Sequence, residues 1–197
     1  MKRFRIPWQA GGTLSGAIGQ GFNLVTPLQI ASVLSALANG GRLYQPRIVQ
    51  YVRDTQGEMI KEFPPQVLKN IPISPETMAI VSEALWGVVN SPGGTGGRAR
   101  IVGFDVAGKT GTAQVIQRKE GRSESSSPDL QDHAWFACFA PASQPQITVV
   151  AMIEHGGHGG AAAAPVARKV LEAFYGRKNG GPSPFQLVRQ PPPEPQE

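Results

Sequence analysis

The residues best suited to chemistry in this sequence lie within residues 103–112, the stretch GFDVAGKTGT. Lysine flanked by small residues can bind an anion, because the ammonium group supplies charge and the small neighbours let a ligand approach. Residues 103–110 fit G-x-x-x-x-G-K-[ST], the pattern of a phosphate-binding loop, whereas Lys109, Thr110 and Gly111 by themselves fit a lysine carried on a strand. These two alternatives require different backbones around Lys109.

The residues after Lys109 favour a strand. A phosphate-binding loop continues into a helix, whose N-terminal N–H groups bind the phosphate. Here Thr110, Gly111 and Thr112 follow, and β-branched residues beside a glycine disfavour a helix. A carboxylate for magnesium at the end of an apolar strand is also missing, Glu154 being the best candidate. We therefore predict that Lys109 lies on a strand, with an NTPase as a remote alternative.

Three histidines and a cysteine are further candidates. Glu154, His155 and His158 form E-H-x-x-H, which could hold zinc on a helix. Because two glycines separate these histidines at the end of a predicted strand, we predict a glycine-rich link that borders a cleft and no metal site. His133, at a predicted strand start, is assigned a capping or surface role. Cys138 has apolar neighbours and is predicted to be a small core residue, not a nucleophile.

A helix is predicted from the stretch TPLQIASVLSALANGG, residues 26–41. Thr26 can cap its N-terminus, Gln29 completes a capping box, and the final Asn-Gly-Gly ends it. The apolar residues expected to face inward include Leu28, Leu34 and, at the margin, Val33.

The later elements are predicted in the order hairpin, helix, three strands and helix. The hairpin turns at residues 54–57, and a helix runs from Ser74 to about Val89. Three strands begin near residues 106, 133 and 146, and a last helix near residue 161 has Val166, Val170 and Phe174 on one apolar stripe. This order predicts an α+β fold, with an antiparallel sheet of three core strands flanked by helices.

Length and charge limit the possible functions. The 197 residues are enough for one ordinary domain, and the net charge of +5 is scattered without a nucleic-acid motif, so no nucleic-acid partner is predicted. No stretch approaches the ~20 apolar residues of a membrane span, and no signal peptide is evident. We predict a basic leader at residues 1–10, a folded part at 11–176 and a disordered Gly/Pro-rich tail at 177–197.

Several stretches together resemble the transpeptidase domain of class B penicillin-binding proteins, especially the elongation-type penicillin-binding protein 2. They are AGKTGTAQV, AIGQGFNLVTPLQIASVLSALANGG, GGTGGRA, DHAWFACFAPA and APVARKVLEAF. The resemblance covers nearly all of 11–176 and implies a serine penicillin-binding or β-lactamase-like fold without a cofactor. It implies that Lys109 holds the substrate carboxylate and takes part in the proton network. Thr110, Gly111 and Thr112 would complete the substrate-binding strand, and the Thr112 N–H would be an oxyanion-hole donor.

The family builds its site from S-x-x-K, S-x-N and K-T-G, and this sequence contains only the third motif. None of its serines is followed three residues later by lysine, and none begins S-x-N. The resemblance therefore implies the C-terminal half of a transpeptidase domain with a truncated N-terminus, the nucleophile, pedestal domain and membrane anchor lying elsewhere. We expect such a half to be inactive by itself and to leave apolar surface uncovered, including an apolar groove beside Lys109.

For the complete enzyme, the resemblance implies acyl transfer from D-Ala-D-Ala in peptidoglycan cross-linking. Its partners would be a peptidoglycan stem peptide or a β-lactam, and the membrane-embedded proteins of cell-wall synthesis. Family members are anchored in the plasma membrane with this domain outside the cytoplasm. The alternative from a different class is a non-catalytic half-domain kept as a binding module, which explains the missing serine motif directly.

Overall fold

The computed structural model describes residues 10–20, 23–115 and 131–178. Nearly all of the predicted leader and tail, and most of the polar link after residue 117, lie outside these residues. The elements are α1 (Ala10–Ala17), α2 (Pro27–Ala38), β1 (Arg42–Tyr44), β2 (Tyr51–Arg53), β3 (Met59–Glu62), β4 (Val67–Asn70), α3 (Pro75–Asn90), the 3-10 helix η1 (Gly97–Ala99), β5 (Ala107–Ala113), β6 (His133–Ala140), β7 (Ile147–Ile153) and α4 (Gly159–Lys178).

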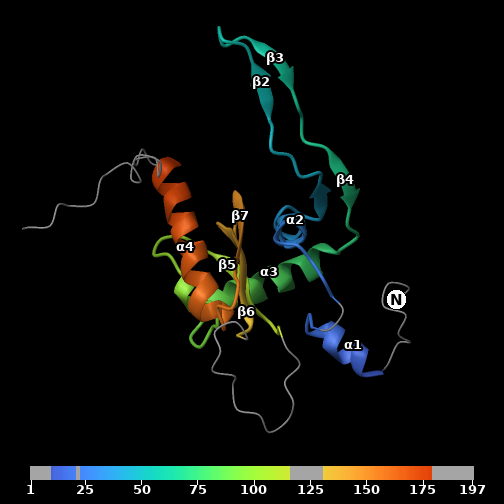
Figure 1. Ribbon diagram of the computed structural model, residues 1–197, viewed down its shortest axis with the longest axis vertical. Coiled ribbons are helices and arrows are strands. Elements are labelled where there is room, and N and C mark those ends of the chain that lie inside the picture. Colours follow the sequence, from blue (N-terminus) through green and yellow to red (C-terminus); the bar gives the residue numbers. More distant parts are fainter. Residues whose placement is uncertain (1–9, 21–22, 116–130, 179–197) are drawn as a thin grey trace, which may run out of the picture.

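The centre of the fold is an antiparallel sheet with the strand order β5-β6-β7. Its register is continuous, with Lys109 opposite Ala137 and Cys138 opposite Val149. In Figure 1 these strands are seen nearly edge-on between the helices. The predicted α+β fold with three core strands is therefore confirmed, and β5, which carries Lys109, lies at one edge of this sheet.

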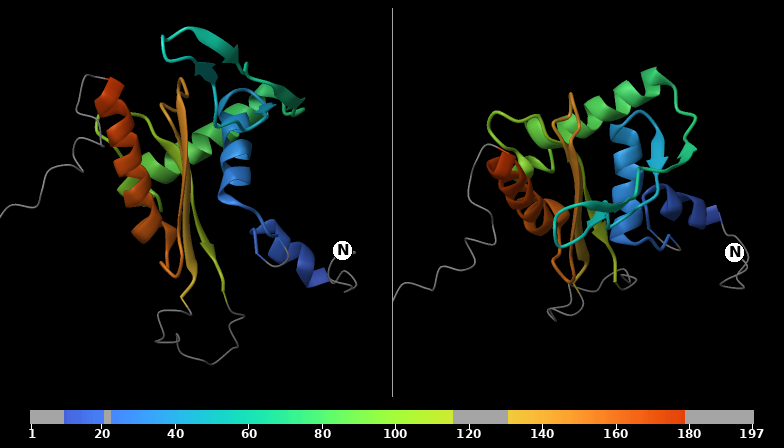
Figure 2. Two further views of the ribbon diagram at one scale, coloured as in Figure 1. Left: turned by 45° about the horizontal axis from the view of Figure 1, so that its top comes forward. Right: turned by 90° about the horizontal axis from the view of Figure 1, so that it is seen from above.

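Helices cover the two faces of the sheet. Figure 2 shows α4 on one face and α2 on the other, with α3 crossing near β5. The larger core lies on the α4 face, where Phe136 and Cys138 are completely buried. A smaller cluster on the α2 face is made of Leu34, Ala107 and Phe139. Among the described residues, no helix is both long enough and apolar enough to cross a membrane.

The helix predicted at residues 26–41 is confirmed together with both of its end signals. The Gln29 N–H donates to Thr26 Oγ1 over 3.2 Å, and the Thr26 N–H donates to Gln29 Oε1 over 2.8 Å. After the helix, Gly40 and Gly41 adopt φ values of 82° and 94°, which glycine reaches without strain. The capping box thus fixes the position where α2 begins against the sheet.

The face that α4 buries differs from the predicted apolar stripe. Val166 and Val170 are 40% and 44% exposed, and the buried stripe is instead made of small residues together with Leu171 and Tyr175, the small ones being Ala163, Ala164 and Ala167. Alanines let the helix approach the sheet closely, so packing distance overrides the larger apolar area of valine. The sequence analysis also missed α1, β1 and β4.

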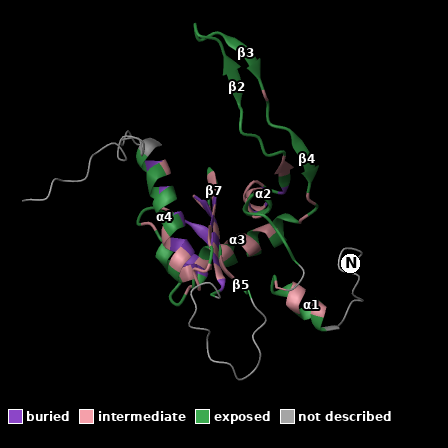
Figure 3. Ribbon diagram, viewed as in Figure 1, coloured by how far each residue is buried: buried purple, intermediate pink, exposed green. Residues whose placement is uncertain are grey.

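Two regions leave apolar side chains exposed. Leu28 and Val33 on the outer side of α2 are 60% and 55% exposed, contrary to their predicted inward position. Strands β2 and β3 pair only with each other, at the predicted turn, and stand away from the sheet (Figure 1). All of their residues are exposed, as the green ribbon of this arm in Figure 3 shows. The expected uncovered apolar surface is therefore present.

Candidate functional site

Strand β5 presents its K-T-G residues on two different faces. Side chains alternate along a strand, so Lys109 lies on the same face as Ala107, toward α2, whereas Thr110 and Thr112 lie on the α4 face. Lys109 is exposed, and its Nζ donates to the carbonyl oxygen of Thr110 over 2.9 Å. No carboxylate among the described residues pairs with this lysine, so its charge is available to a ligand.

An open groove of about 650 Å³ lies along the α4 side of β5. It is lined by Gly94, Thr95, Gly97, Arg98, Thr110, Thr112, His158, Gly159, Gly160 and Ala161. Lys109 is not among these residues, so this groove is not the apolar groove that was predicted beside it. Arg98 brings a positive charge to the groove, and Thr95, Thr110 and Thr112 bring hydroxyl groups.

Glycines allow the groove walls to meet β5 closely. A Cβ at Gly108 would lie 2.8 Å from the Ala137 carbonyl oxygen and from Cys138 Cβ, and a Cβ at Gly111 would lie 3.1 Å from Trp135 Cβ. At the start of α4, a Cβ at Gly159 would collide with the carbonyl oxygens of Trp135 and Gly111. Gly108 and Gly159 therefore leave no room for a side chain, whereas a side chain at Gly111 would require Trp135 to shift slightly.

One hydroxyl pair joins the loop before η1 to β5. Thr95 Oγ1 and Thr110 Oγ1 are 2.9 Å apart and share a hydrogen bond. A Cβ at Gly160 would meet the Thr95 carbonyl oxygen, so α4, this loop and β5 converge at Thr95. The contact fixes the Thr110 side chain at the groove.

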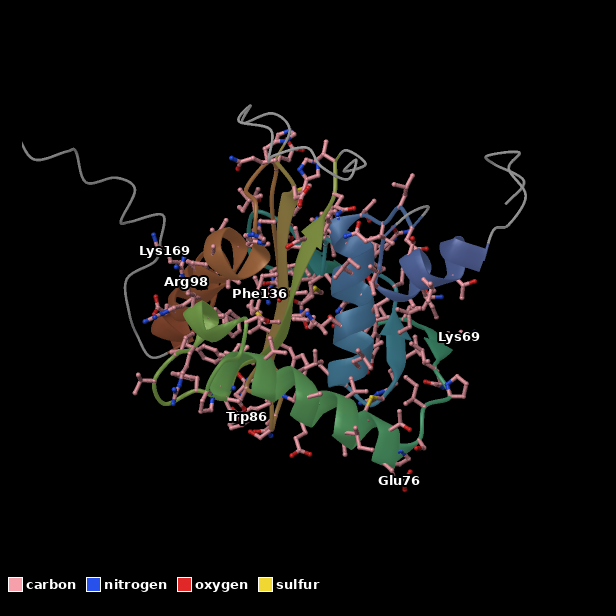
Figure 4. The ribbon with its side chains drawn as sticks, turned by 90° about the horizontal axis from the view of Figure 1, so that it is seen from below. Lys69, Glu76, Trp86, Arg98, Phe136 and Lys169 are labelled. Carbon is pink, nitrogen blue, oxygen red and sulfur yellow. The ribbon has the colours of Figure 1, made fainter. Side chains whose placement is uncertain are left out.

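Arg98 supplies a hydrogen-bond donor that the first turns of α4 lack. Pro165 lies inside this helix and has no N–H, so the carbonyl of Ala161, four residues earlier, lacks its helical donor. Arg98 Nη1 donates to this carbonyl over 3.1 Å from the neighbouring η1 segment. Figure 4 shows Arg98 beside α4 and Phe136 within the sheet. Arg98 therefore holds the α4 wall of the groove in place as well as bringing charge to it.

Side-chain hydrogen bonds lie along the outer edge of β5 and at the residue before it. Asn90 Nδ2 donates to the Val106 carbonyl over 2.8 Å, Lys109 Nζ bonds the Thr110 carbonyl as above, and Gln20 Nε2 donates to the Thr112 carbonyl over 2.8 Å. In an antiparallel pair, the backbone groups of alternate residues face away from the partner strand. Thr110 and Thr112 therefore direct their backbone groups away from β6.

The histidines of E-H-x-x-H diverge. His155 packs on His133 with ring centroids 4.8 Å apart, and its N–H donates to His133 Nδ1 over 3.0 Å. His158 instead lines the groove, and Glu154 is exposed. The predicted glycine-rich link bordering a cleft is confirmed for His158. His133 accepts a backbone N–H just after the end of β7, a structural contact of the capping kind.

Two further predictions concern Lys109 and Cys138. The residues after Lys109 continue strand β5, so the helix that a phosphate-binding loop requires is not formed and the NTPase alternative is contradicted. Cys138 is buried, and burial raises the pKa of its thiol from 9.0 to about 12. Its thiol therefore stays protonated near neutral pH, which confirms a core residue.

A sequence-family profile for the penicillin-binding protein transpeptidase domain matches residues 5–172. This chain belongs to that family. Among curated relatives of the transpeptidase domain, the peptidoglycan D,D-transpeptidase MrdA of Haemophilus influenzae is 34% identical over 183 residues, which cover 90% of this chain and 28% of that protein. The MrdA of Escherichia coli K12 is 30% identical over 87% of this chain and 27% of its own length.

Solved structures of penicillin-binding proteins agree with this assignment. Pseudomonas aeruginosa penicillin-binding protein 2 superposes with a TM-score of 0.69 at 33% identity, over 88% of this chain and 36% of that one. Penicillin-binding protein A of Mycobacterium tuberculosis, as a penicillin G acyl-enzyme, gives 0.65 at 29% identity, over 82% and 34%. The fold is thus that of part of a penicillin-binding transpeptidase domain, and the chain spans just over a quarter of the length of the curated relatives it matches.

Sequence reasoning found the strand with Lys109 but missed residues that surround it. Gln20, Asn90 and Arg98 reach their partners through contacts between segments distant in the sequence. One signal was available, because Pro165 inside a predicted helix leaves a carbonyl without a donor. The pairing of Thr95 with Thr110 had no such signal.

Proposed function

We propose that this transpeptidase segment supplies the anion-binding wall and part of the oxyanion hole of a serine D,D-transpeptidase that cross-links peptidoglycan. The observation that carries the proposal is the K-T-G strand at an outer edge of the sheet, with Lys109 exposed and unpaired with any described carboxylate. The substrate would be the D-Ala-D-Ala end of a stem peptide, and a β-lactam would occupy the same position.

Each strand residue has a proposed role. Lys109 holds the substrate carboxylate electrostatically and takes part in the proton network around the nucleophile. The Thr112 hydroxyl, on the opposite face from Lys109, would reach the same carboxylate around the open edge of β5. Its N–H, which shares this edge with its carbonyl, stabilises the oxyanion. Thr110 anchors the strand to Thr95, and Gly111 leaves room where a side chain would meet Trp135.

The reaction would follow the usual course of acyl transfer. A serine hydroxyl oxygen attacks the carbonyl carbon of the penultimate D-Ala, and its proton passes to a neighbouring base. The base gives this proton to the leaving nitrogen as the peptide C–N bond breaks and D-Ala departs. An acceptor amine then attacks the acyl-enzyme and regenerates the serine. The serine and its lysine would come from S-x-x-K, which this sequence does not contain.

The test transplants this chain into a relative that carries the other motifs. In Haemophilus influenzae MrdA, the aligned segment is replaced by this sequence, and acylation by a fluorescent penicillin is followed on denaturing gels. We expect the chimera to acylate and Lys109→Ala to slow acylation by about 100-fold or more, since one transition-state contact typically contributes 10²–10³. Lys69→Ala is the matched control, an exposed lysine on β4, away from the groove (Figure 4).

A folded chimera that does not acylate, or one in which Lys109→Ala matches Lys69→Ala, would refute the proposal. Circular dichroism and thermal melting of each variant separate a folding failure from a catalytic one. The chain by itself should form no covalent adduct with the fluorescent penicillin, because none of its serines has a lysine three residues later. A labelled band from the isolated chain would point to a different nucleophile.

The alternative is a binding module without catalysis. The exposed apolar side chains of α2 favour it, because Leu28 and Val33 are 60% and 55% exposed and each offers apolar contact to a partner. For Helicobacter pylori, a complex of penicillin-binding protein 2 with MreC has been solved. We propose that this protein likewise associates with membrane-embedded proteins of cell-wall synthesis. We also propose that its transpeptidase segment lies outside the cytoplasm. Co-purification of the chimera with MreC-type proteins would support it, and a chimera recovered alone would count against it.

A further inference from the structure

We propose that Gln20 is a displaceable cap on the outer edge of β5, and that it competes with the backbone of an extended ligand. The inference rests on the proposed function, because it concerns how a peptide reaches the strand that carries Lys109. It makes Gln20 a residue that tunes ligand affinity without taking part in bond breaking.

The contacts of Gln20 are those of a short substitute strand. Its Nε2 donates to the Thr112 carbonyl over 2.8 Å, and its Oε1 accepts the Gln114 N–H over 3.5 Å. One amide therefore provides the donor and the acceptor that an added strand would provide. Gln20 reaches this edge from 92 residues away in the sequence, just after helix α1.

An edge strand with unpaired N–H and C=O groups is a template for another extended chain. Here Gln20 covers the Thr112 end, while Lys109 Nζ folds back on the Thr110 carbonyl next to it. A peptide that pairs with β5 at Thr112 must remove the Gln20 amide first. A side-chain amide on a surface segment is easily displaced, since the ligand replaces its hydrogen bonds one for one.

The longer of the two contacts predicts how displacement begins. The Gln114 N–H bond at 3.5 Å lies at the limit of hydrogen-bond length, whereas the Thr112 bond is short. The Gln114 bond is therefore the weaker of the two and is expected to open first. Thr112 is the position where removing Gln20 should matter most, and it is also the proposed oxyanion-hole residue.

The first measurement uses the full chain without ligand. Gln20→Ala should speed amide hydrogen exchange at Gln114 and shift the backbone resonances of Thr112 and its neighbours. Gln20→Glu keeps an acceptor but loses the donor, so it should free the Thr112 carbonyl while retaining protection at Gln114. The matched control is Gln56→Ala, whose side chain lies at the exposed hairpin turn between β2 and β3. Unchanged exchange and shifts in Gln20→Ala would overturn the contact.

The second measurement titrates the same proteins with an amine-blocked tripeptide that ends in D-Ala-D-Ala. Loss of a competing amide should tighten binding to Gln20→Ala by about 3- to 10-fold, the equivalent of one exchanged hydrogen bond. Equal or weaker binding would overturn the competition and make Gln20 a structural tie or a ligand contact. If neither protein binds the peptide, the proposed peptide binding fails together with the competition, whereas the exchange data still decide the contact.

Discussion

On one face of the β5–β6–β7 sheet, α4 buries Phe136 and Cys138 completely, whereas on the opposite side α2 leaves Leu28 and Val33 60% and 55% exposed. Helix α4 carries charged residues on its exposed side, such as Arg168 and Glu172, whereas α2 contains no charged residue. A helix that is apolar on all sides is normally buried on all sides. The α4 face is therefore a finished core, and the α2 layer has the composition of a helix that another layer covers.

The groove along β5 lies on only one of these two sides. It lies on the finished side, where glycines bring α4 and the Thr95 loop close to β5. Lys109 lies on the α2 side, where cover is incomplete. The groove is thus formed within this chain, and the lysine faces the side on which Leu28 and Val33 of α2 stay exposed.

The sharpest test of the comparison removes a large side chain from the finished core. Phe136→Ala should lower the free energy of unfolding by about 3–5 kcal/mol, because it leaves a cavity among fully buried neighbours. Leu28→Ala is the control on the outer side of α2 and should cost less than about 1 kcal/mol. Urea denaturation of both variants makes the measurement, and equal losses would erase the distinction between the two sides.

A smaller loss is expected from crowding α4 against the groove. Gly160→Ala should cost about 1–3 kcal/mol, because its Cβ would collide with the Thr95 carbonyl oxygen. Gly176→Ala in the same helix has no atom within 4 Å and should stabilise by up to about 1 kcal/mol through backbone entropy. If thermal melting shows the two variants changing stability in the same direction, α4 does not pack this closely in solution.

Cys138 gives a pH test of the finished face. Burial raises its thiol pKa from 9.0 to about 12, so the unfolded chain loses this proton first as the pH rises. Below pH 9 the thiol makes its full contribution to the free energy of unfolding. Between pH 9 and 12 this contribution falls by up to about 1.4 kcal/mol per pH unit. In urea denaturation at a series of pH values, Cys138→Ala should not show this fall in the free energy of unfolding. Identical slopes for parent and variant would mean that water reaches the α4 face.

The smallest effect is expected on the uncovered side. Val33→Thr should change the free energy of unfolding by no more than about 0.5 kcal/mol, since its side chain is 55% exposed. The same change should lower binding of a hydrophobic dye and improve solubility, because it reduces an exposed apolar patch. A loss above 1 kcal/mol that depends on protein concentration would show that self-association covers α2.

Much of the fold could be predicted because its signals are local. The capping box at Thr26, the Ser74 helix start and the hairpin turn at residues 54–57 all formed as predicted. Each depends on residues within one turn of one another, where a side chain meets its own backbone. The strand at Lys109 was likewise decided by its β-branched neighbours.

The predictions that failed concern places where the local sequence allows more than one arrangement. In α4, either the valine stripe or the alanine stripe could face a sheet, and hydrophobicity favoured Val166 and Val170. Close approach required small residues at the contact, and this requirement depends on the opposite wall. The predicted apolar groove at Lys109 failed similarly, because strand alternation placed Thr110 and Thr112 on the groove side.

By itself, the sequence determined that Lys109 lies on a strand, where two helices begin and end, and that Cys138 is buried. Short-range sterics and hydrophobicity set these features. The tertiary structure alone decided that Thr95 meets Thr110, that Arg98 replaces the donor missing at Pro165, and that Gln20 covers Thr112. Those contacts join residues 15, 63 and 92 positions apart. Hydrogen bonds across such separations form only after the sheet and its helices have packed, so no local pattern encodes them.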